Sequence, residues 1–201
     1  MDDYPPSGQY AYYANSIAVR PSADASSPSE IWVASKVVDS QKVAGLAPIL
    51  RRSADGGANW TTAAALPVPS AYSIPSVGSV TVDWSGRAFV SASCSKKVGK
   101  TSESHALIYR STNGGVSWTL VDDVAGSYDD NGGAVDAFNG IFFTGAGLTR
   151  ASLDGGSTWV TVTAVAGGSC IAADRVGNVF AGGSVTSGST TYGNIYKLPV
   201  P

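Results

Sequence analysis

The segment Ser152-Leu-Asp-Gly-Gly-Ser-Thr-Trp159 occurs in nearly the same form at two earlier places in the chain. Residues 53–60 read Ser-Ala-Asp-Gly-Gly-Ala-Asn-Trp, and residues 111–118 read Ser-Thr-Asn-Gly-Gly-Val-Ser-Trp. All three fit the octapeptide pattern S-x-[DN]-G-G-x-x-W. A short carboxylate or amide side chain accepts hydrogen bonds from a turn backbone, and two glycines adopt positive φ at no steric cost. The octapeptide therefore predicts a tight β-hairpin whose returning strand starts at the Trp.

We expect the octapeptide positions to be structural rather than catalytic or metal-binding, because each carboxylate or amide is used by its own turn. Asn113 replaces the Asp of the other two copies and leaves the pattern intact. The predicted structural positions are Ser53, Asp55, Gly56, Gly57, Trp60, Ser111, Asn113, Gly114, Gly115, Trp118, Ser152, Asp154, Gly155, Gly156 and Trp159.

A second turn motif lies about halfway between successive octapeptides. Asp83, Asp136 and Asp174 are each followed six residues later by Phe. The fourth residue of each motif is of a type that tolerates a left-handed conformation, namely Gly86, Asn139 or Gly177. These Asp-x-x-Gly segments predict a second set of hairpin turns.

Apolar runs flank both turn motifs and predict four repeated units of β-strands, at 15–67, 76–124, 130–165 and 168–201. In the first two units the predicted strands are 17–19, 31–34, 49–52 and 60–63, then 80–82, 88–92, 106–110 and 118–121. In the last two they are 134–135, 141–144, 148–151 and 159–162, then 170–172, 179–181 and 195–198. The fourth unit lacks an octapeptide and an outer strand.

The octapeptide resembles the Asp-box, or bacterial neuraminidase repeat, of sialidase-like β-propellers. The resemblance implies an all-β fold: a β-propeller of about four four-stranded blades with Asp-box hairpins, forming a single domain over residues 1–201. The first blade departs from the pattern, since Arg20 and Pro21 replace the turn Asp and a Ser/Ala/Pro-rich insertion follows.

Asp-box propellers usually have six or more blades, so the way this ring is completed stays open. The N-terminal segment 8–14 is one candidate for the missing outer strand of the last blade. A homodimer that completes a larger ring is a second solution, and a fragment of a longer propeller is a third. An open monomer would leave two apolar faces exposed, which disfavours it.

The sialidase resemblance does not extend to the catalytic residues. Sialidases use an arginine triad whose first member lies in Arg-Ile-Pro, a Tyr nucleophile activated by a Glu, and an Asp acid/base. The chain has no Arg-Ile-Pro, and its only glutamates, Glu30 and Glu103, fall in predicted loops. Residues 16–21 resemble a xyloglucanase string, but Arg20 takes the Asp position. We therefore expect no catalytic residues, while a divergent sialidase-like or xyloglucanase-like glycoside hydrolase stays the alternative.

Propellers of this type place ligands on the face opposite the Asp-boxes, where loops and linkers between blades gather. His105 is the only histidine and is expected at the surface, and arginines 51, 52, 110 and 150 are expected at solvated positions. Exposed Tyr beside short polar groups suits carbohydrate stacking. The candidate ligand-binding residues are Tyr72, Lys96, Lys97, His105, Tyr128, Asp129, Asp130 and Tyr192.

Composition excludes several classes of protein. A formal net charge of −2 gives no electrostatic footprint for nucleic acid, and no apolar run approaches 18 residues. The N-terminus lacks the basic start and apolar stretch of a signal peptide, although the composition fits a secreted bacterial protein. Cys94 and Cys170 have no metal-ligand spacing and are expected to be small buried hydrophobes.

The prediction from sequence is therefore a non-catalytic binding or interaction module that recognises a carbohydrate or a protein surface. We expect no cofactor and no bound metal.

Overall fold

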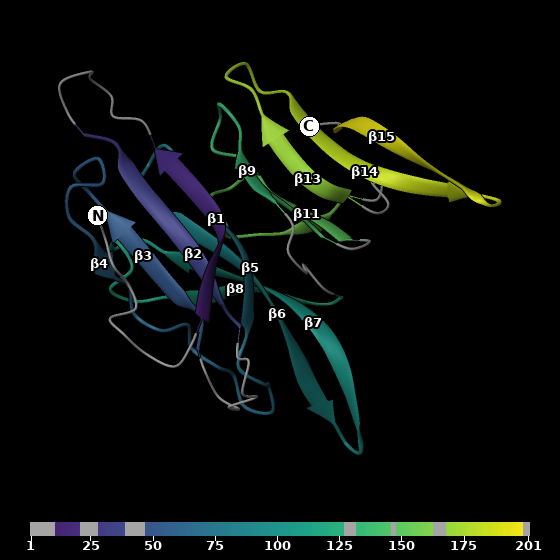
Figure 1. Ribbon diagram of the computed structural model, residues 1–201, viewed down its shortest axis with the longest axis horizontal. Coiled ribbons are helices and arrows are strands. Elements are labelled where there is room, and N and C mark those ends of the chain that lie inside the picture. The colour runs from purple at the N-terminus through teal and green to yellow at the C-terminus, as the bar shows by residue number, and fades with distance from the viewer. Residues whose placement is uncertain are drawn as a thin grey trace.

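The computed structural model is built of β-strands in four separate antiparallel sheets, and no helix occurs in the part of the chain that it describes (Figure 1). The structure describes residues 11–20, 28–38, 47–126, 132–145, 148–162 and 168–198. The predicted all-β class is confirmed. None of these segments is a helix of the length and apolarity needed to cross a membrane.

The sheets follow one another along the chain, and strands that are consecutive in sequence are neighbours in each sheet. The first sheet contains β1 (Ala11–Arg20), β2 (Glu30–Val38), β3 (Ile49–Ser53) and β4 (Thr61–Thr62). The second contains β5 (Ser76–Val82), β6 (Ala88–Val98), β7 (Thr101–Ser111) and β8 (Thr119–Ala125). The third contains β9 (Gly133–Val135), β10 (Ile141–Gly145), β11 (Leu148–Ser152) and β12 (Val160–Thr161). The fourth has three strands, β13 (Gly168–Ala173), β14 (Val179–Ser187) and β15 (Thr190–Leu198).

Every predicted strand has a counterpart, but two predicted loops are hairpins. β6 and β7 extend beyond the residues that pair with β5 and β8. Val98 pairs with Thr101, so the two strands are joined by the two-residue turn Gly99–Lys100. β14 and β15 meet in the same way around Gly188. Gly99 and Gly188 have φ of 60° and 63°, as expected for the first turn residue of a II′ hairpin. Both hairpins project from the body of the molecule in Figure 1.

The N-terminal segment does not complete the fourth sheet, as far as the structure describes it. Residues 11–14 are the start of β1 and pair with the end of β2, with Ala11 opposite Val38. Residues 11–14 therefore belong to the first sheet, and the described part of the fourth sheet has no strand beyond β15, so the sequence-based solution is not what the structure shows for these residues. Residues 8–10 lie outside the described ones.

The core consists of three apolar layers, one between each pair of consecutive sheets. The first layer is the largest and includes Trp32, Leu50, Val80, Val90, Tyr109 and Trp118. The second includes Phe89, Ile108, Ile141 and Phe143. The third includes Phe142, Ala151, Val179, Ala181 and Leu198. Each inner sheet thus has both faces covered, which is why its strands are continuously apolar.

Both cysteines are free. Cys94 is buried in the first apolar layer, as predicted, but Cys170 is exposed on the fourth sheet, which corrects the expectation that both are buried.

Candidate functional site

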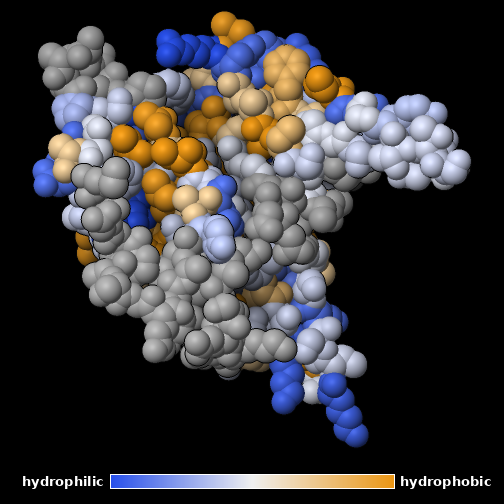
Figure 2. Space-filling model, in the orientation of Figure 1, coloured by the Kyte–Doolittle hydropathy of each residue, from blue (hydrophilic) through white to orange (hydrophobic). Residues whose placement is uncertain are grey.

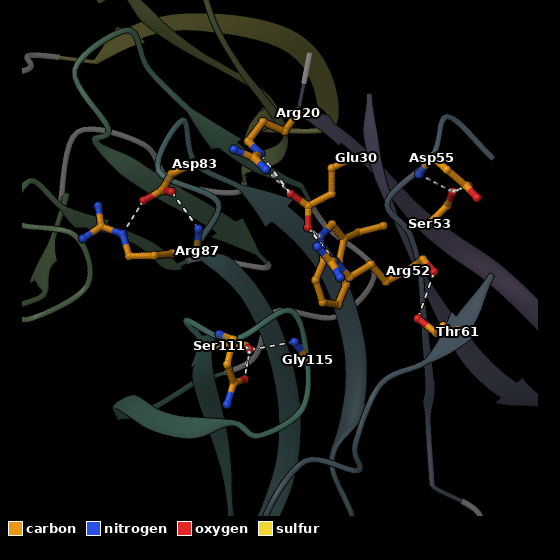
Figure 3. Close-up of polar contacts among 12 residues, drawn as sticks. Arg20, Glu30, Arg52, Ser53, Asp55, Thr61, Asp83, Arg87, Ser111 and Gly115 are labelled. Carbon is orange, nitrogen blue, oxygen red and sulfur yellow. Dashed lines mark hydrogen bonds and ion pairs between the residues drawn. The ribbon is translucent and has the colours of Figure 1, made fainter. Parts of the chain in front are cut away.

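The three octapeptides form the predicted tight hairpins, and their serines close them. In each copy the serine hydroxyl accepts a hydrogen bond from the N–H of the second glycine at 2.8 to 2.9 Å, as Figure 3 shows for Ser111 and Gly115. Asp55 Oδ1 accepts the backbone N–H of Asn59 at 2.8 Å, and these local hydrogen bonds lower the pKa of Asp55 to about 2. The octapeptide oxygens are therefore bound within their own turns.

The Asp-x-x-Gly segments also form the predicted turns. Asp136 Oδ1 accepts the N–H groups of Phe138 and Gly140 at 2.8 and 2.7 Å, and Asp174 is used in the same way. Asn139 has the expected left-handed φ of 65°. In the second sheet Asp83 also binds the Arg87 guanidinium (Figure 3).

Glu30 corrects the expectation that it lies in a loop. It begins β2 instead of lying in a loop, and its buried carboxylate binds Arg20 and Arg52 at 2.7 Å each (Figure 3). Trp32 Nε1 donates a third hydrogen bond to it at 3.0 Å. Burial would raise the pKa of Glu30, but these three donors outweigh burial and hold it below the ordinary value. Glu30 therefore has a structural role.

The third-strand arginines are engaged rather than solvated. Arg150 is buried and binds both oxygens of Asp122 at 2.7 and 2.8 Å, which ties the third sheet to the second. Arg110 donates to the carbonyl of Gly155 in the next octapeptide at 3.0 Å. Arg51 bonds Thr62 within its own sheet. These arginine side chains therefore form hydrogen bonds and ion pairs within the fold.

Four polar side chains meet at the end of the second sheet that is opposite its octapeptide. Tyr72 donates to Asp123 Oδ2 at 2.5 Å, and His105 Nδ1 lies 2.6 Å from Asp123 Oδ1. The Tyr72 and His105 rings meet edge to face at 5.4 Å. Lys96 Nζ lies 5.1 Å from the centre of the Tyr72 ring. We refer to Tyr72, Lys96, His105 and Asp123 as the Tyr72 cluster.

Register explains why these residues meet. A short bridge pairs Tyr72, in the segment that links the first two sheets, with Lys96 on β6. Across β6 and β7 Cys94 is opposite His105, and β8 brings Asp123 alongside β7. The cluster therefore draws on one linker and three strands.

The Tyr72 cluster holds charge of both signs at neutral pH. Burial would raise the pKa of Asp123, but hydrogen bonds from Tyr72 and His105 hold it below its ordinary value. Partial burial and the neighbouring Asp123 raise the pKa of Tyr72, so its hydroxyl stays protonated. Contact with the Tyr72 hydroxyl raises the pKa of Lys96.

His105 is buried, which corrects the expectation of a surface side chain. Its Nε2 atom is buried and has no hydrogen-bond partner among the described residues, and a carboxylate oxygen of Glu103 lies 3.6 Å away. The Nδ1 atom of His105 is engaged with Asp123, so the imidazole helps to hold this carboxylate in place.

An open cavity of about 280 Å³ lies beside the Tyr72 cluster. Its walls include direct sequence neighbours of Tyr72 and His105, and most of them carry hydroxyl groups. The lining residues are Ser73, Ile74, Ser76, Ser93, Cys94, Ser95 and Ser104. Burial raises the pKa of the Cys94 thiol to about 11, so it is not a nucleophile at neutral pH.

The structure brings together three of the candidate ligand residues, namely Tyr72, Lys96 and His105. Lys97 is exposed on the projecting β6–β7 hairpin, and Tyr192 lies on the β14–β15 hairpin of another sheet. Residues 128–130, which contain the other three candidates, lie outside the described ones.

Asp123 was not among the sequence-based candidates. In the sequence it stands beside Asp122, and adjacent acidic residues are typical of a solvated segment. Their alternation on β8 separates them, since Asp122 binds Arg150 in the third sheet and Asp123 faces Tyr72. The described residues contain no group of three or more His, Cys, Asp or Glu side chains arranged to hold a metal ion.

No protein-family model and no curated protein matches this chain. Among solved structures it is similar to a protein of unknown function from Dyadobacter fermentans DSM 18053, with a TM-score of 0.58 and 16% sequence identity. The match covers 90% of this chain and 60% of that one, so this chain spans less than two thirds of that protein's length. At this identity the likeness concerns the fold alone.

Proposed function

We propose that this chain is a non-catalytic binding module on an Asp-box β-propeller, and that the Tyr72 cluster with its serine-lined cavity binds carbohydrate. The propeller is supported by consecutive four-stranded sheets packed face to face, each octapeptide forming the outer hairpin. A second cavity of about 180 Å³ is lined jointly by the first strands of three sheets, as expected near a propeller axis.

The arrangement of the Tyr72 cluster carries the proposal. The partly exposed Tyr72 side chain offers aromatic surface to a sugar ring, while Lys96 over that ring and Asp123 at its hydroxyl supply a charged donor and acceptor. The adjoining serine hydroxyls both donate and accept hydrogen bonds, which suits a ligand rich in hydroxyl groups. The openness of the site to solvent suits an exposed glycan chain.

One observation favours the alternative of a divergent glycoside hydrolase. Tyr72 is hydrogen-bonded to a carboxylate, as a sialidase-type nucleophile would be. The raised pKa of Tyr72 weighs against it, because an activated nucleophile needs the opposite shift. Arginines 20, 52 and 150 are held by structural carboxylates, so they are not available as a substrate clamp.

The test is a glycan array probed with the wild-type chain, followed by titration with the glycan that gives the strongest signal. Replacing Tyr72 with Ala is expected to weaken binding about tenfold, the loss of roughly 1.4 kcal/mol of ring contact and hydrogen bonding. Tyr192→Ala is the matched control, since Tyr192 is an exposed tyrosine on a different sheet.

Lys96→Ala is a second variant, expected to weaken binding without changing the fold because alanine keeps the backbone pairing of β6 with β7 and with Tyr72. An array without signal, or affinity that neither substitution changes, would refute the carbohydrate site. Hydrolysis of an aryl glycoside that is lost in Tyr72→Phe would favour the hydrolase instead.

A further inference from the structure

An aromatic side chain from each of the first two sheets enters the octapeptide of the next sheet. Trp32 on β2 packs edge to face on Trp118 with ring centres 5.8 Å apart. A Cβ atom on Gly115 would lie 2.9 Å from the Trp32 ring, so glycine is needed there to admit the ring. Phe89 on β6 occupies the same place against Trp159 and Gly156. Each octapeptide therefore has a receiving side.

A cation accompanies each of these aromatic side chains. In register, Trp32 is opposite Arg52 and Phe89 is opposite Arg110. The Arg110 guanidinium donates to Gly155 of the next octapeptide at 3.0 Å. The Arg52 guanidinium lies against Gly114, whereas at the corresponding Gly155 the nearest guanidinium is that of Arg87 and Arg110 lies beside Gly156. The pair of aromatic ring and cation therefore characterises a sheet face that contacts an octapeptide.

The third sheet shows what happens when no octapeptide follows. Phe142 occupies the aromatic position, but the residue opposite it is Ala151. The fourth sheet, onto which this face packs, has no octapeptide. The cation is thus absent where there is no glycine pair for it to contact.

In the fourth sheet an aromatic side chain and a cation are again opposite each other. Phe180 on β14 is opposite Lys197 on β15. Phe180 is 38% exposed, whereas Trp32, Phe89 and Phe142 are at most 2% exposed. Ile195, at the register position that Leu50 fills in the first sheet, is 82% exposed. We call the face formed by Phe180, Ile195 and Lys197 the fourth-sheet face.

In the part of the chain that the structure describes, no aromatic side chain from another sheet enters the octapeptide of the first sheet. A Cβ atom on Gly57 would approach only Ile31 and Trp60, both of its own sheet. On the same side of this sheet Ile17 is 67% exposed and Val19 is 51% exposed. Figure 2 shows apolar side chains at the surface over this sheet and again over the fourth. We call this side of the first sheet the first-sheet face.

We propose that the fourth-sheet face binds the first-sheet face of a second copy of this chain. Phe180 would enter the octapeptide at Gly57, and Lys197 would lie against its glycine pair, repeating the contact between the first two sheets. Both faces are exposed in one chain, so they do not satisfy each other within it. Two copies joined head to tail cover all four faces and close a ring of eight sheets.

The first measurement is the solution mass of the purified chain across a range of concentrations. We expect twice 20.4 kDa for the wild type and 20.4 kDa for Ile195→Asp, which places a charge in the centre of the fourth-sheet face. Val176→Asp is the matched control, because Val176 is also an aliphatic residue of the fourth sheet's hairpins and is 75% exposed, but it lies in a turn outside this face. The control should keep the dimer mass.

The two free thiols supply a second measurement on the same samples. Cys170 is exposed and pairs with Gly182, next to Phe180 and Ile195, while Cys94 is buried within the chain. Cys170 should react with a maleimide at least tenfold more slowly in the wild-type dimer than in Ile195→Asp. Cys94 should be equally slow in both and so report that the fold is intact.

Mixing two variants tests the head-to-tail arrangement. Ile17→Asp should also be a monomer, since it damages the first-sheet face. An equimolar mixture of Ile17→Asp and Ile195→Asp has one undamaged contact for each pair of chains, so a dimer should reappear in the mixture alone.

Three results would overturn the proposal. They are a mass of 20.4 kDa at every concentration, a ladder of species larger than the dimer, and a dimer in which Cys170 reacts as fast as in Ile195→Asp. The last result would mean that some other surface joins the copies.

Discussion

The octapeptide turn depends on hydrogen-bond geometry rather than on charge. Asn113 Oδ1 accepts the N–H of Ser117 at 3.0 Å, as Asp55 Oδ1 accepts that of Asn59. In every copy the serine hydroxyl likewise accepts a hydrogen bond from the N–H of the second glycine. An amide thus replaces a carboxylate without loss, which is why these acidic residues are poor candidates for catalysis.

Glu30 is the residue at which charge does matter. Glu30→Gln keeps the size of the side chain but removes the charge from its hydrogen bonds with Arg20 and Arg52, and should cost about 2 kcal/mol of unfolding free energy at pH 7. The pKa of Glu30 in the fold is below the ordinary value of 4.5, so its contribution is present above that pH and is lost as pH falls through the lowered value. Urea titrations from pH 7 to pH 3 would measure both effects.

Between pH 7 and pH 3 the wild type loses unfolding free energy partly because Glu30 becomes protonated. The Glu30→Gln variant should not show this part of the loss. Glu103→Gln is the control, because that carboxylate is more than half exposed and should change stability by less than about 0.5 kcal/mol. Equal losses in the two variants would mean that the Glu30 ion pairs do not stabilise the fold.

At the scale of the element, the contact between consecutive sheets depends on glycine. Gly156 has φ of 81°, and a Cβ atom there would lie 2.5 Å from the buried Phe89 ring. Gly156→Ala should therefore destabilise the chain by about 2 to 4 kcal/mol, from backbone strain and from crowding of the ring.

Gly99→Ala separates these two causes. Gly99 has φ of 60°, but nothing lies within 4 Å of its Cβ position, so only the backbone term applies and the cost should be about 1 kcal/mol. Thermal unfolding of both variants measures the difference. If the two substitutions cost the same, the ring of Phe89 does not need the glycine.

The strands and turns could be predicted from sequence, because they depend on local signals. Apolar periodicity marked every strand, and the Gly pairs marked the hairpins at 55–57, 113–115 and 154–156. The long β6–β7 hairpin was missed because its Ser and Lys residues read as a polar loop. Backbone pairing with β7 and with the linker at Tyr72 extends β6 there, without an apolar face.

The contacts between sheets could not be predicted in this way. Arg150 and Asp122 are 28 positions apart and meet only through the packing of two sheets. Three residues of the Tyr72 cluster were candidates because linkers and strand ends gather at one end of such sheets. The fourth, Asp123, required the register of β8 against β7.

At the scale of the molecule, the proposed dimer links stability to concentration. In such an assembly the dimer dissociates as it unfolds. Each tenfold rise in protein concentration should therefore add about 1.4 kcal/mol per mole of dimer to the free energy of unfolding. The wild-type melting temperature should therefore rise with concentration, and that of Ile195→Asp should stay constant. Calorimetry at about 5, 50 and 500 µM would measure the trend.

A constant wild-type melting temperature would show that the folded unit is one chain. Val176→Asp, which lies outside the fourth-sheet face, should follow the wild type and so exclude a general effect of added charge.

The passage of an aromatic side chain into the following octapeptide has a consequence for synthesis on the ribosome. Trp32 has no binding place until Gly115 and Trp118 have been made, more than eighty residues later. Phe89 waits in turn for Gly156 and Trp159. Until then the Trp32 and Phe89 rings stay exposed on the growing chain. Under the proposed head-to-tail contact, Phe180 would meet its octapeptide in a second copy, so its burial would require an encounter between molecules.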